Sequence, residues 1–260
     1  NTGSGPGTGG SGVTFAEVVG GAPVLDPVLG TSITNGLVWV HNAGTQDTLT
    51  GSNMVNLVSS PADGELSTAY QAGLPGTLIA ETMSDPAYWD VNLTEKPIPA
   101  RTTYTNSLHM TGAEYTFVFG IKFNNDSTSA IWTENNSTSH HGVEFNRRSG
   151  VIQWATRHGV GGSGASFDVP NIITGNWYSV VFRVRQSDGS ISVDVNGTRT
   201  TDTQTILTST AVSTNVPRWF SFPGRFRLDA DVAYLSNYNR YLSDSEAATV
   251  DSEIQSLLKI

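Results

Sequence analysis

Residues that could recognise a sugar are concentrated between positions 130 and 160. Tryptophan rings can stack on the C–H faces of a sugar, while carboxylates, amides and guanidinium groups can pair with its hydroxyls. A tryptophan in a strand is more often a core residue than a binding platform, so both roles stay open for the tryptophans here. The candidate ligand-binding residues are Trp132, Glu144, Asn146, Trp154, Arg157 and His158.

The clearest structural element is a hairpin over residues 177–197. Apolar and polar residues alternate along it in two runs, and successive side chains of a strand point to opposite faces. Asp-Gly at 188–189 and Asn-Gly at 196–197 tolerate the positive φ that tight turns require. We therefore predict two paired strands leading into a third, each with one buried and one solvated face. Trp177 is expected in the core, and Arg183 and Arg185 in solvent or against the rim of a second sheet.

Shorter patterns predict the remaining elements. Ser243 and Glu246 form a capping-box motif ahead of an apolar stripe, which predicts a helix near the end of the sequence. Residues 63–72, which follow Pro61, predict a short helix. Further strands are predicted at residues 37–41, 114–123, 130–132, 143–146, 151–156, 226–228 and 232–235.

Composition limits the classes of function. The 260 residues include no cysteine, which excludes disulfides, thiolate metal sites and a cysteine nucleophile. The net charge of −9 argues against binding to nucleic acid or to anionic lipid, because both need clustered Lys and Arg. No apolar run is long enough to insert into a membrane.

The first residues differ in composition from the rest. Residues 1–12 contain only Asn, Gly, Ser, Thr and Pro, so they are expected to form a flexible linker, followed by an extended segment to residue 30. This segment suggests a homo-oligomer or a domain tethered to a larger assembly. Residues 31–260 are then one domain, with a loop-rich insertion at about residues 51–100. Many short strands and one terminal helix predict an all-β antiparallel jelly-roll β-sandwich with a short C-terminal helix.

Four stretches resemble one known family. They are EYTFVFGIKF, GVEFNRRSGVIQW, NWYSVVFRVRQSDGSISVDVNGT and DVAYLSNYNRYLSDSE. Their order is similar to that of the laminin-G-like modules of the concanavalin A-like lectin/glucanase superfamily, over about residues 104–260. The resemblance implies two curved sheets, with carbohydrate or protein recognition on the concave sheet or the rim loops. It also implies a calcium ion in many members, for which Asp229 and Asp231 are the candidate ligands.

The same superfamily contains glycoside hydrolases and polysaccharide lyases, so the fold alone does not decide activity. A retaining glycosidase places two carboxyl groups about 5 Å apart, which on a strand means alternate positions. Asp229 and Asp231 have this spacing, but the E-x-D-x-x-E run of the family's hydrolases is missing. The Q-x-H strand of its lyases is also missing, since no histidine accompanies Gln153 at the matching position. No catalytic residue is therefore predicted.

These observations favour a non-catalytic recognition or display module. It would be extracellular or on a virion surface (a phage tail or head decoration) or a bacterial surface, and its partner would be a glycan or a surface protein of host or virion. One alternative is a purely structural virion component without a ligand. Another is a polysaccharide-degrading glycosidase or lyase.

Overall fold

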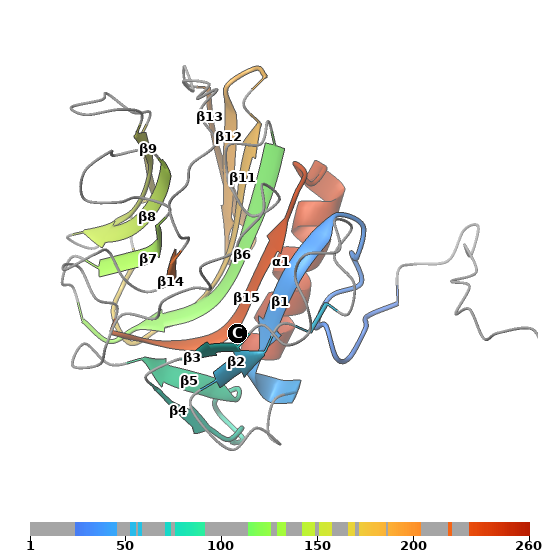
Figure 1. Ribbon diagram of the computed structural model, residues 1–260, viewed down its shortest axis with the longest axis vertical. Helices are drawn as coiled ribbons and strands as arrows, with labels where there is room; N and C mark the ends of the chain where they lie inside the picture. Colours follow the sequence, from blue (N-terminus) through green and yellow to red (C-terminus); the bar gives the residue numbers. More distant parts are fainter. Residues whose placement is uncertain are drawn as a thin grey trace, which may run out of the picture.

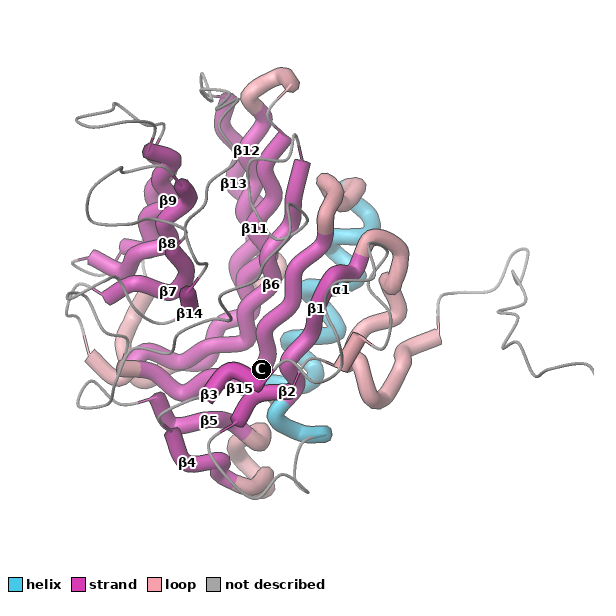
Figure 2. Tube along the Cα trace, in the orientation of Figure 1, coloured by secondary structure: helices cyan, strands magenta, loops and turns pink. Residues whose placement is uncertain are grey.

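Two antiparallel β-sheets face each other, and a single helix covers the outer face of the larger one (Figure 1). The computed structural model describes residues 24–45, 53–55, 57–58, 71–73, 76–91, 114–125, 129–133, 142–148, 151–157, 166–169, 172–185, 187–203, 218–219 and 229–260. The fold is thus a β-sandwich, and strands dominate the described residues (Figure 2).

The larger sheet has eight strands in the described residues. Their order is β13-β12-β11-β6-β15-β5-β4, and β1 pairs with β15 on the same side as β5. Strand β15 is therefore central, because it joins β6 on one side to β1 and β5 on the other. The strands are β1 (Leu37–Asn42), β4 (Gly76–Ile79), β5 (Tyr88–Val91), β6 (Glu114–Phe123), β11 (Trp177–Arg185), β12 (Ser190–Val195), β13 (Thr198–Thr203) and β15 (Ala230–Tyr238).

The smaller sheet has five strands in the described residues, in the order β10-β9-β8-β7-β14. They are β7 (Ser129–Thr133), β8 (Gly142–Arg148), β9 (Val151–Arg157), β10 (Ser166–Val169) and β14 (Arg218–Trp219). Strands β2 (Asn53–Val55) and β3 (Gln71–Gly73) form a separate pair, and a 3-10 turn, η1, covers Ala43–Thr45. The predicted helix over residues 63–72 is wrong at its end, where β3 begins, and residues 63–70 lie outside the described part of the chain.

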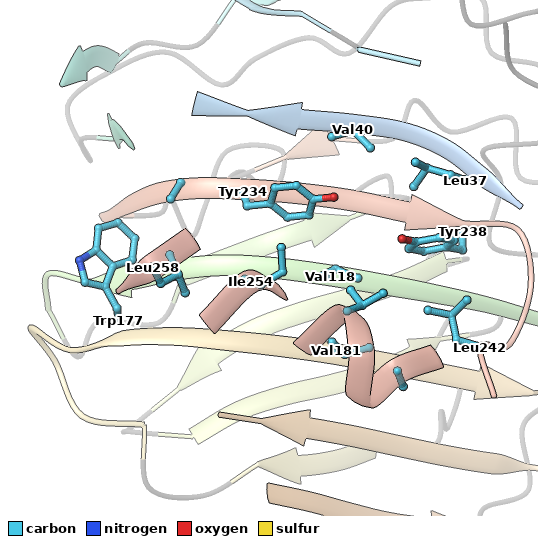
Figure 3. Packing of buried hydrophobic residues seen from close by; sticks show 13 residues of the cluster. Leu37, Val40, Val118, Trp177, Val181, Tyr234, Tyr238, Leu242, Ile254 and Leu258 are labelled. Carbon is cyan, nitrogen blue, oxygen red and sulfur yellow. The ribbon is translucent and has the colours of Figure 1, made fainter. Parts of the chain in front are cut away.

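Helix α1 (Asp244–Leu258) packs its apolar stripe on the outer face of the larger sheet (Figure 3). Ile254 and Leu258 lie in one buried cluster with Val118, Val181 and other residues of β6, β11 and β15. Gly120 allows this close contact, because a Cβ atom there would lie 3.2 Å from Leu258 Cδ2 and 3.1 Å from Tyr234 Cβ. The predicted capping box is confirmed, since Ser243 Oγ accepts from Glu246 N and Glu246 Oε2 accepts from Ser243 N.

The inner face of the larger sheet is also buried. Phe117 and Phe119 of β6 stack with their ring centroids 5.8 Å apart, and both side chains are excluded from solvent. Strands β6 and β11 are thus covered on both faces, by the helix and by the second sheet. The predicted solvated face of residues 177–185 is wrong for Ser179, Val181 and Arg183, which are buried for this reason, whereas Arg185 at the end of the strand is partly exposed, as predicted.

The predicted hairpin itself is confirmed. Strand β11 pairs with β12 from Val180 opposite Val195 to Arg185 opposite Ser190. The turn residues Gly189, Asn196 and Gly197 all have positive φ. Trp177 is buried, as predicted. Among the described residues, no helix has both the length and the apolar composition needed to cross a bilayer.

Candidate ligand-binding site

The register of the smaller sheet aligns five aromatic residues in one row across its strands. Trp219 lies opposite Trp132, Trp132 opposite Phe145, Phe145 opposite Trp154, and Trp154 opposite Phe167. Directly opposed residues share a face of a sheet. The two tryptophans of the predicted sugar site therefore belong to one aromatic face.

The polar residues of the predicted site occupy the other face of the same sheet. Glu144 pairs with Ala155, Asn146 with Gln153, and Arg157 with Gly142, all at positions alternate to the aromatic row. In the same register, Gln153 also pairs with Asp168 of β10, which is exposed. The structure brings Glu144, Asn146 and Arg157 onto one face and places Trp132 and Trp154 on the opposite one, while His158 lies outside the described residues.

The two predicted calcium ligands already have polar partners. Lys122 Nζ lies 2.7 Å from Asp231 Oδ2, and the amide of Asn124 donates to both Asp229 Oδ1 and Asp231 Oδ1 at 3.2 Å. Asn125 Nδ2 donates to Asp229 Oδ2 at 2.6 Å. Calcium needs oxygen ligands, whereas these carboxylates face an ammonium and two amide N–H groups. The arrangement does not match a calcium site, and calcium stays a prediction from the resemblance. No metal-binding cluster of three or more His, Asp or Glu occurs in the described part of the chain.

Lys122 lies between two carboxylates, with its Nζ 2.7 Å from Asp231 Oδ2 and 3.9 Å from Asp85 Oδ1. Its ammonium is 4.9 Å from the ring centroid of Trp177 and 5.2 Å from that of Tyr88, so two aromatic rings flank the cation. Burial alone would lower the pKa of Lys122, but the hydrogen bond to Asp231 raises it above its ordinary value. The Trp177 indole donates to Asp85 and lowers the pKa of that carboxyl. The cluster ties the start of β11 to β5, β6 and β15, which favours a structural role.

A pocket of about 550 Å³ lies where β11, β12 and β13 meet the start of α1. The loop between β15 and the helix supplies Tyr241, whose ring centroid lies 4.8 Å from the guanidinium of Arg183 and 4.7 Å from that of Arg185. The pocket thus combines one aromatic ring with hydroxyl, carboxylate and guanidinium groups. Its lining residues are Arg185, Ser190, Ile191, Thr201, Asp202, Thr203, Arg240, Tyr241, Ser243, Asp244 and Glu246.

Arg183 links the strands and the loop that form this pocket. Its Nη1 donates to the carbonyl of Leu242 and to Asp244 Oδ1, both at 2.8 Å, and its Nη2 donates to Ser192 Oγ at 2.7 Å. The guanidinium therefore joins β11 and β12 to the loop that carries Tyr241. Arg183 positions the aromatic ring rather than facing the pocket itself.

Glu246 also lines the pocket, and its hydrogen bonds fix the start of the helix. Its carboxylate accepts from Arg240 Nη2 at 2.7 Å and from Arg240 Nη1 at 2.9 Å, as well as from the backbone N–H of Ser243. The hydrogen bonds from Arg240, followed by those from Ser243, lower the pKa of the Glu246 carboxyl to about 2.

A pH dependence of stability follows from this shift. The folded-state pKa lies below the ordinary value of 4.5, so the contribution of Glu246 is complete above about pH 4.5 and is lost as the pH falls toward about 2. We expect the free energies of unfolding of the wild type and Glu246→Gln to differ most at pH 7 and to converge across this window. Urea unfolding at several pH values measures both; a difference that does not change with pH would contradict the assignment.

The sequence did not predict Tyr241 as a ligand-binding residue. Residues 238–243 stood out only as part of the resemblance, and Arg183 was expected on a solvated face. The one available signal was the group of arginine and tyrosine side chains at the end of the hairpin and in the loop before the capping box.

Comparison with solved structures finds similar folds among the binding domains of botulinum neurotoxins. The serotype D/C binding domain is 12% identical with a TM-score of 0.54, covering 85% of this chain and 52% of that one. The botulinum neurotoxin DC domain in complex with rat synaptotagmin II is 12% identical, with a TM-score of 0.53 and the same coverages. The same domain in complex with SialylT is 11% identical, with a TM-score of 0.52, covering 85% of this chain and 51% of that one.

This chain spans about half the length of those binding domains. At such low identity the likeness establishes the β-sandwich fold and nothing finer. A scan against protein-family models finds no match, and neither does a search of curated proteins. Membership of the laminin-G-like family stays a prediction.

Proposed function

We propose that the protein is a non-catalytic recognition module that binds a glycan in the pocket at Tyr241. The observation that carries the proposal is the pocket itself, in which an aromatic ring lies among hydroxyl, carboxylate and guanidinium groups. Rings of this kind contact the C–H face of a sugar, and the polar groups can exchange hydrogen bonds with its hydroxyls. The volume of about 550 Å³ is within the range of small-ligand pockets.

Two of the three carboxylates that line the pocket are engaged in ways that favour binding over catalysis. Glu246 is held by Arg240, and Asp244 is held by Arg183 at 2.8 Å. The pKa of each of these carboxyls is lowered by its arginine partner. A general acid in glycoside hydrolysis needs a raised pKa, so neither group suits that role.

The fold supports recognition as the general role. The botulinum neurotoxin domains with a similar fold are binding domains, seen with rat synaptotagmin II and with SialylT. By this analogy the partner is a glycan or a surface protein. The face of the smaller sheet to which the register assigns Glu144, Asn146 and Arg157 is the proposed surface for a protein partner. Absence of cysteine, a low Lys content and the Gly-rich start of the sequence support placement outside the cell or on a virion surface.

A glycan array followed by calorimetry with the strongest glycan tests this proposal. Tyr241→Ala is expected to weaken binding about two- to tenfold, because a contact made by an aromatic ring is worth about 0.5–1.5 kcal/mol. Tyr241→Phe, which keeps the ring, should retain most of the affinity. Arg157→Ala, on the smaller sheet, is the control and should bind like the wild type.

Two results would overturn the proposal. One is an array on which no glycan binds. The other is a glycan whose affinity falls for Arg157→Ala and stays unchanged for Tyr241→Ala, which would move the site to the smaller sheet. Circular dichroism of each variant confirms that loss of binding does not reflect loss of fold.

A further inference from the structure

Strand β13 forms one edge of the larger sheet, beside β12 (Figure 1). It pairs with β12 along its whole length, and in the described part of the chain no strand pairs with its other side. All of its residues except Arg199 are exposed. The open side of such a strand presents backbone N–H and C=O groups that can pair with a strand of another chain.

The backbone groups of Arg199 and Thr201 point away from β12. Opposed residues of an antiparallel pair alternate between pairs that exchange hydrogen bonds and pairs that do not. Ser190 and Thr203 are opposed, yet each donates its backbone N–H to an aspartate side chain, at 3.0 Å and 2.7 Å, so this pair does not exchange them. By alternation, the pairs that Thr201 and Arg199 make with β12 are of the same kind. Their N–H and C=O groups are therefore directed to the open edge.

Strand β13 lacks the features that usually prevent pairing at an edge. Protected edges carry proline, lysine or a β-bulge. Residues 198–203 contain no proline or lysine, and their pairing with β12 runs without a register shift. The guanidinium of Arg199 is turned back into its own subunit, where it binds Asp194 and Asp244. The other residues are threonines and one aspartate, and threonine favours strands because its side chain is β-branched.

We propose that β13 pairs antiparallel with β13 of a second copy of this chain, about a two-fold axis at Thr201. The register that this axis sets opposes Thr201 to its own copy, Arg199 to the partner's Thr203 and Thr200 to the partner's Asp202. No like charges are then directly opposed, whereas an axis at Arg199 or at Asp202 would oppose each of these charges to its own copy. An axis at Thr200 would leave the carbonyl of Thr203 unused.

The pairing brings two Tyr241 pockets together, because Thr201 and Thr203 both line that pocket. Residues opposed across the axis share a face of the joined sheet, so the two pockets open on the same face. Two sites on one face bind a surface that carries many copies of a glycan more tightly than either site alone. This consequence rests on the proposed function, whereas the pairing of the strands does not.

Sedimentation equilibrium without any glycan tests the pairing. A single pair of short strands buries less surface than a stable interface does, so the wild type is expected to form a weak, reversible dimer at high protein concentration. Thr201→Pro removes an N–H that β12 does not use, and it should raise the dimer dissociation constant at least tenfold while circular dichroism stays that of the folded protein. Thr201→Val keeps the N–H and should dimerise like the wild type.

Single cysteines test the register, because the chain has no cysteine of its own. With the axis at Thr201, the two copies of Thr201→Cys have their Cα atoms about 5.5 Å apart, which a disulfide can span. Oxidation with diamide should link this variant into a covalent dimer at least tenfold faster than Thr200→Cys, which faces the partner's Asp202. Equal rates for the two variants would overturn the proposed register.

The same variant tests the consequence for binding. On a glycan-coated surface, oxidised Thr201→Cys should dissociate at least tenfold more slowly than its reduced form at a protein concentration at which the reduced form is monomeric. Equal dissociation rates would contradict the placement of both pockets on one face. A wild type that stays monomeric up to millimolar concentration would overturn the pairing, and so would equal dimer dissociation constants for Thr201→Pro and Thr201→Val. A glycan array with no binding would instead defeat the proposed function and leave the pairing to be decided by sedimentation.

Discussion

Replacing Arg183 with methionine is expected to destabilise the protein by about 3–5 kcal/mol, the cost of removing one partner from a buried ion pair. The guanidinium is fully buried and holds the Leu242 carbonyl, Asp244 and Ser192. Asp194, which is also buried, lies 3.7 Å away and would lose part of its compensation. Methionine keeps much of the buried stem but restores none of these hydrogen bonds. Urea unfolding followed by tryptophan fluorescence measures the change.

Arg185→Met is the control for this measurement. Arg185 lies two residues along the same strand and contacts the same tyrosine ring, but its side chain is 37% exposed and its partner Asp188 is at the surface. An exposed pair of this kind contributes about 0–1 kcal/mol. Equal losses in the two variants would contradict the view that Arg183 is a structural anchor and Arg185 a surface residue.

Ile254→Ala is expected to cost about 2–5 kcal/mol, because it leaves a cavity between helix α1 and the larger sheet. Ile254 is fully buried, and its Cγ2 lies within 3.4 Å of where a Cβ atom on Gly120 would be. The sheet carries a glycine at this point, so no neighbouring side chain stands ready to fill the space. Thermal and urea unfolding should both register the loss.

Ser252→Ala provides the comparison within the same helix. Ser252 is exposed, so its substitution should change stability by no more than about 0.5 kcal/mol. A small effect of Ile254→Ala would mean that the helix contributes little to the stability of the sandwich. In that case the buried stripe of α1 would not be what fixes it to β6 and β11.

Local sequence predicted β1, β6, β15 and the 177–197 hairpin of the larger sheet, but neither its strands β4 and β5 nor what covers its outer face. Alternation over residues 177–185 placed Ser179 and Arg183 on a polar face, which normally indicates solvent. In the structure Ser179 and Arg183 are buried on this face, because each finds a hydrogen-bond partner on the helix or on the loop before it. Ser179 Oγ donates to the carbonyl of Asp251, and Arg183 donates to that of Leu242. A hydrogen-bonded polar residue and a solvated one look the same in a hydrophobic pattern.

The candidate site was harder to predict for a related reason. The tryptophans and polar residues of the 130–160 hairpin are close in sequence, but the strand register divides them between two faces. Tyr241 lines one pocket with Arg185 and Asp202 only because β11, β12 and β13 lie side by side and the chain returns through β15. Such contacts depend on the pairing of distant strands, which local alternation does not specify.

The central place of β15 has a consequence for how the protein folds. This strand pairs with β1, β5 and β6, all of which precede it by long stretches of chain. Pairings between residues far apart in sequence must pay the entropy of closing large loops before they gain any contact energy, and they slow folding. Until residues 230–238 are in place, the β6–β11–β12–β13 half of the sheet has an uncovered edge at β6, where it can pair wrongly with another chain. We therefore expect this protein to refold slowly, and to aggregate during refolding at high protein concentration.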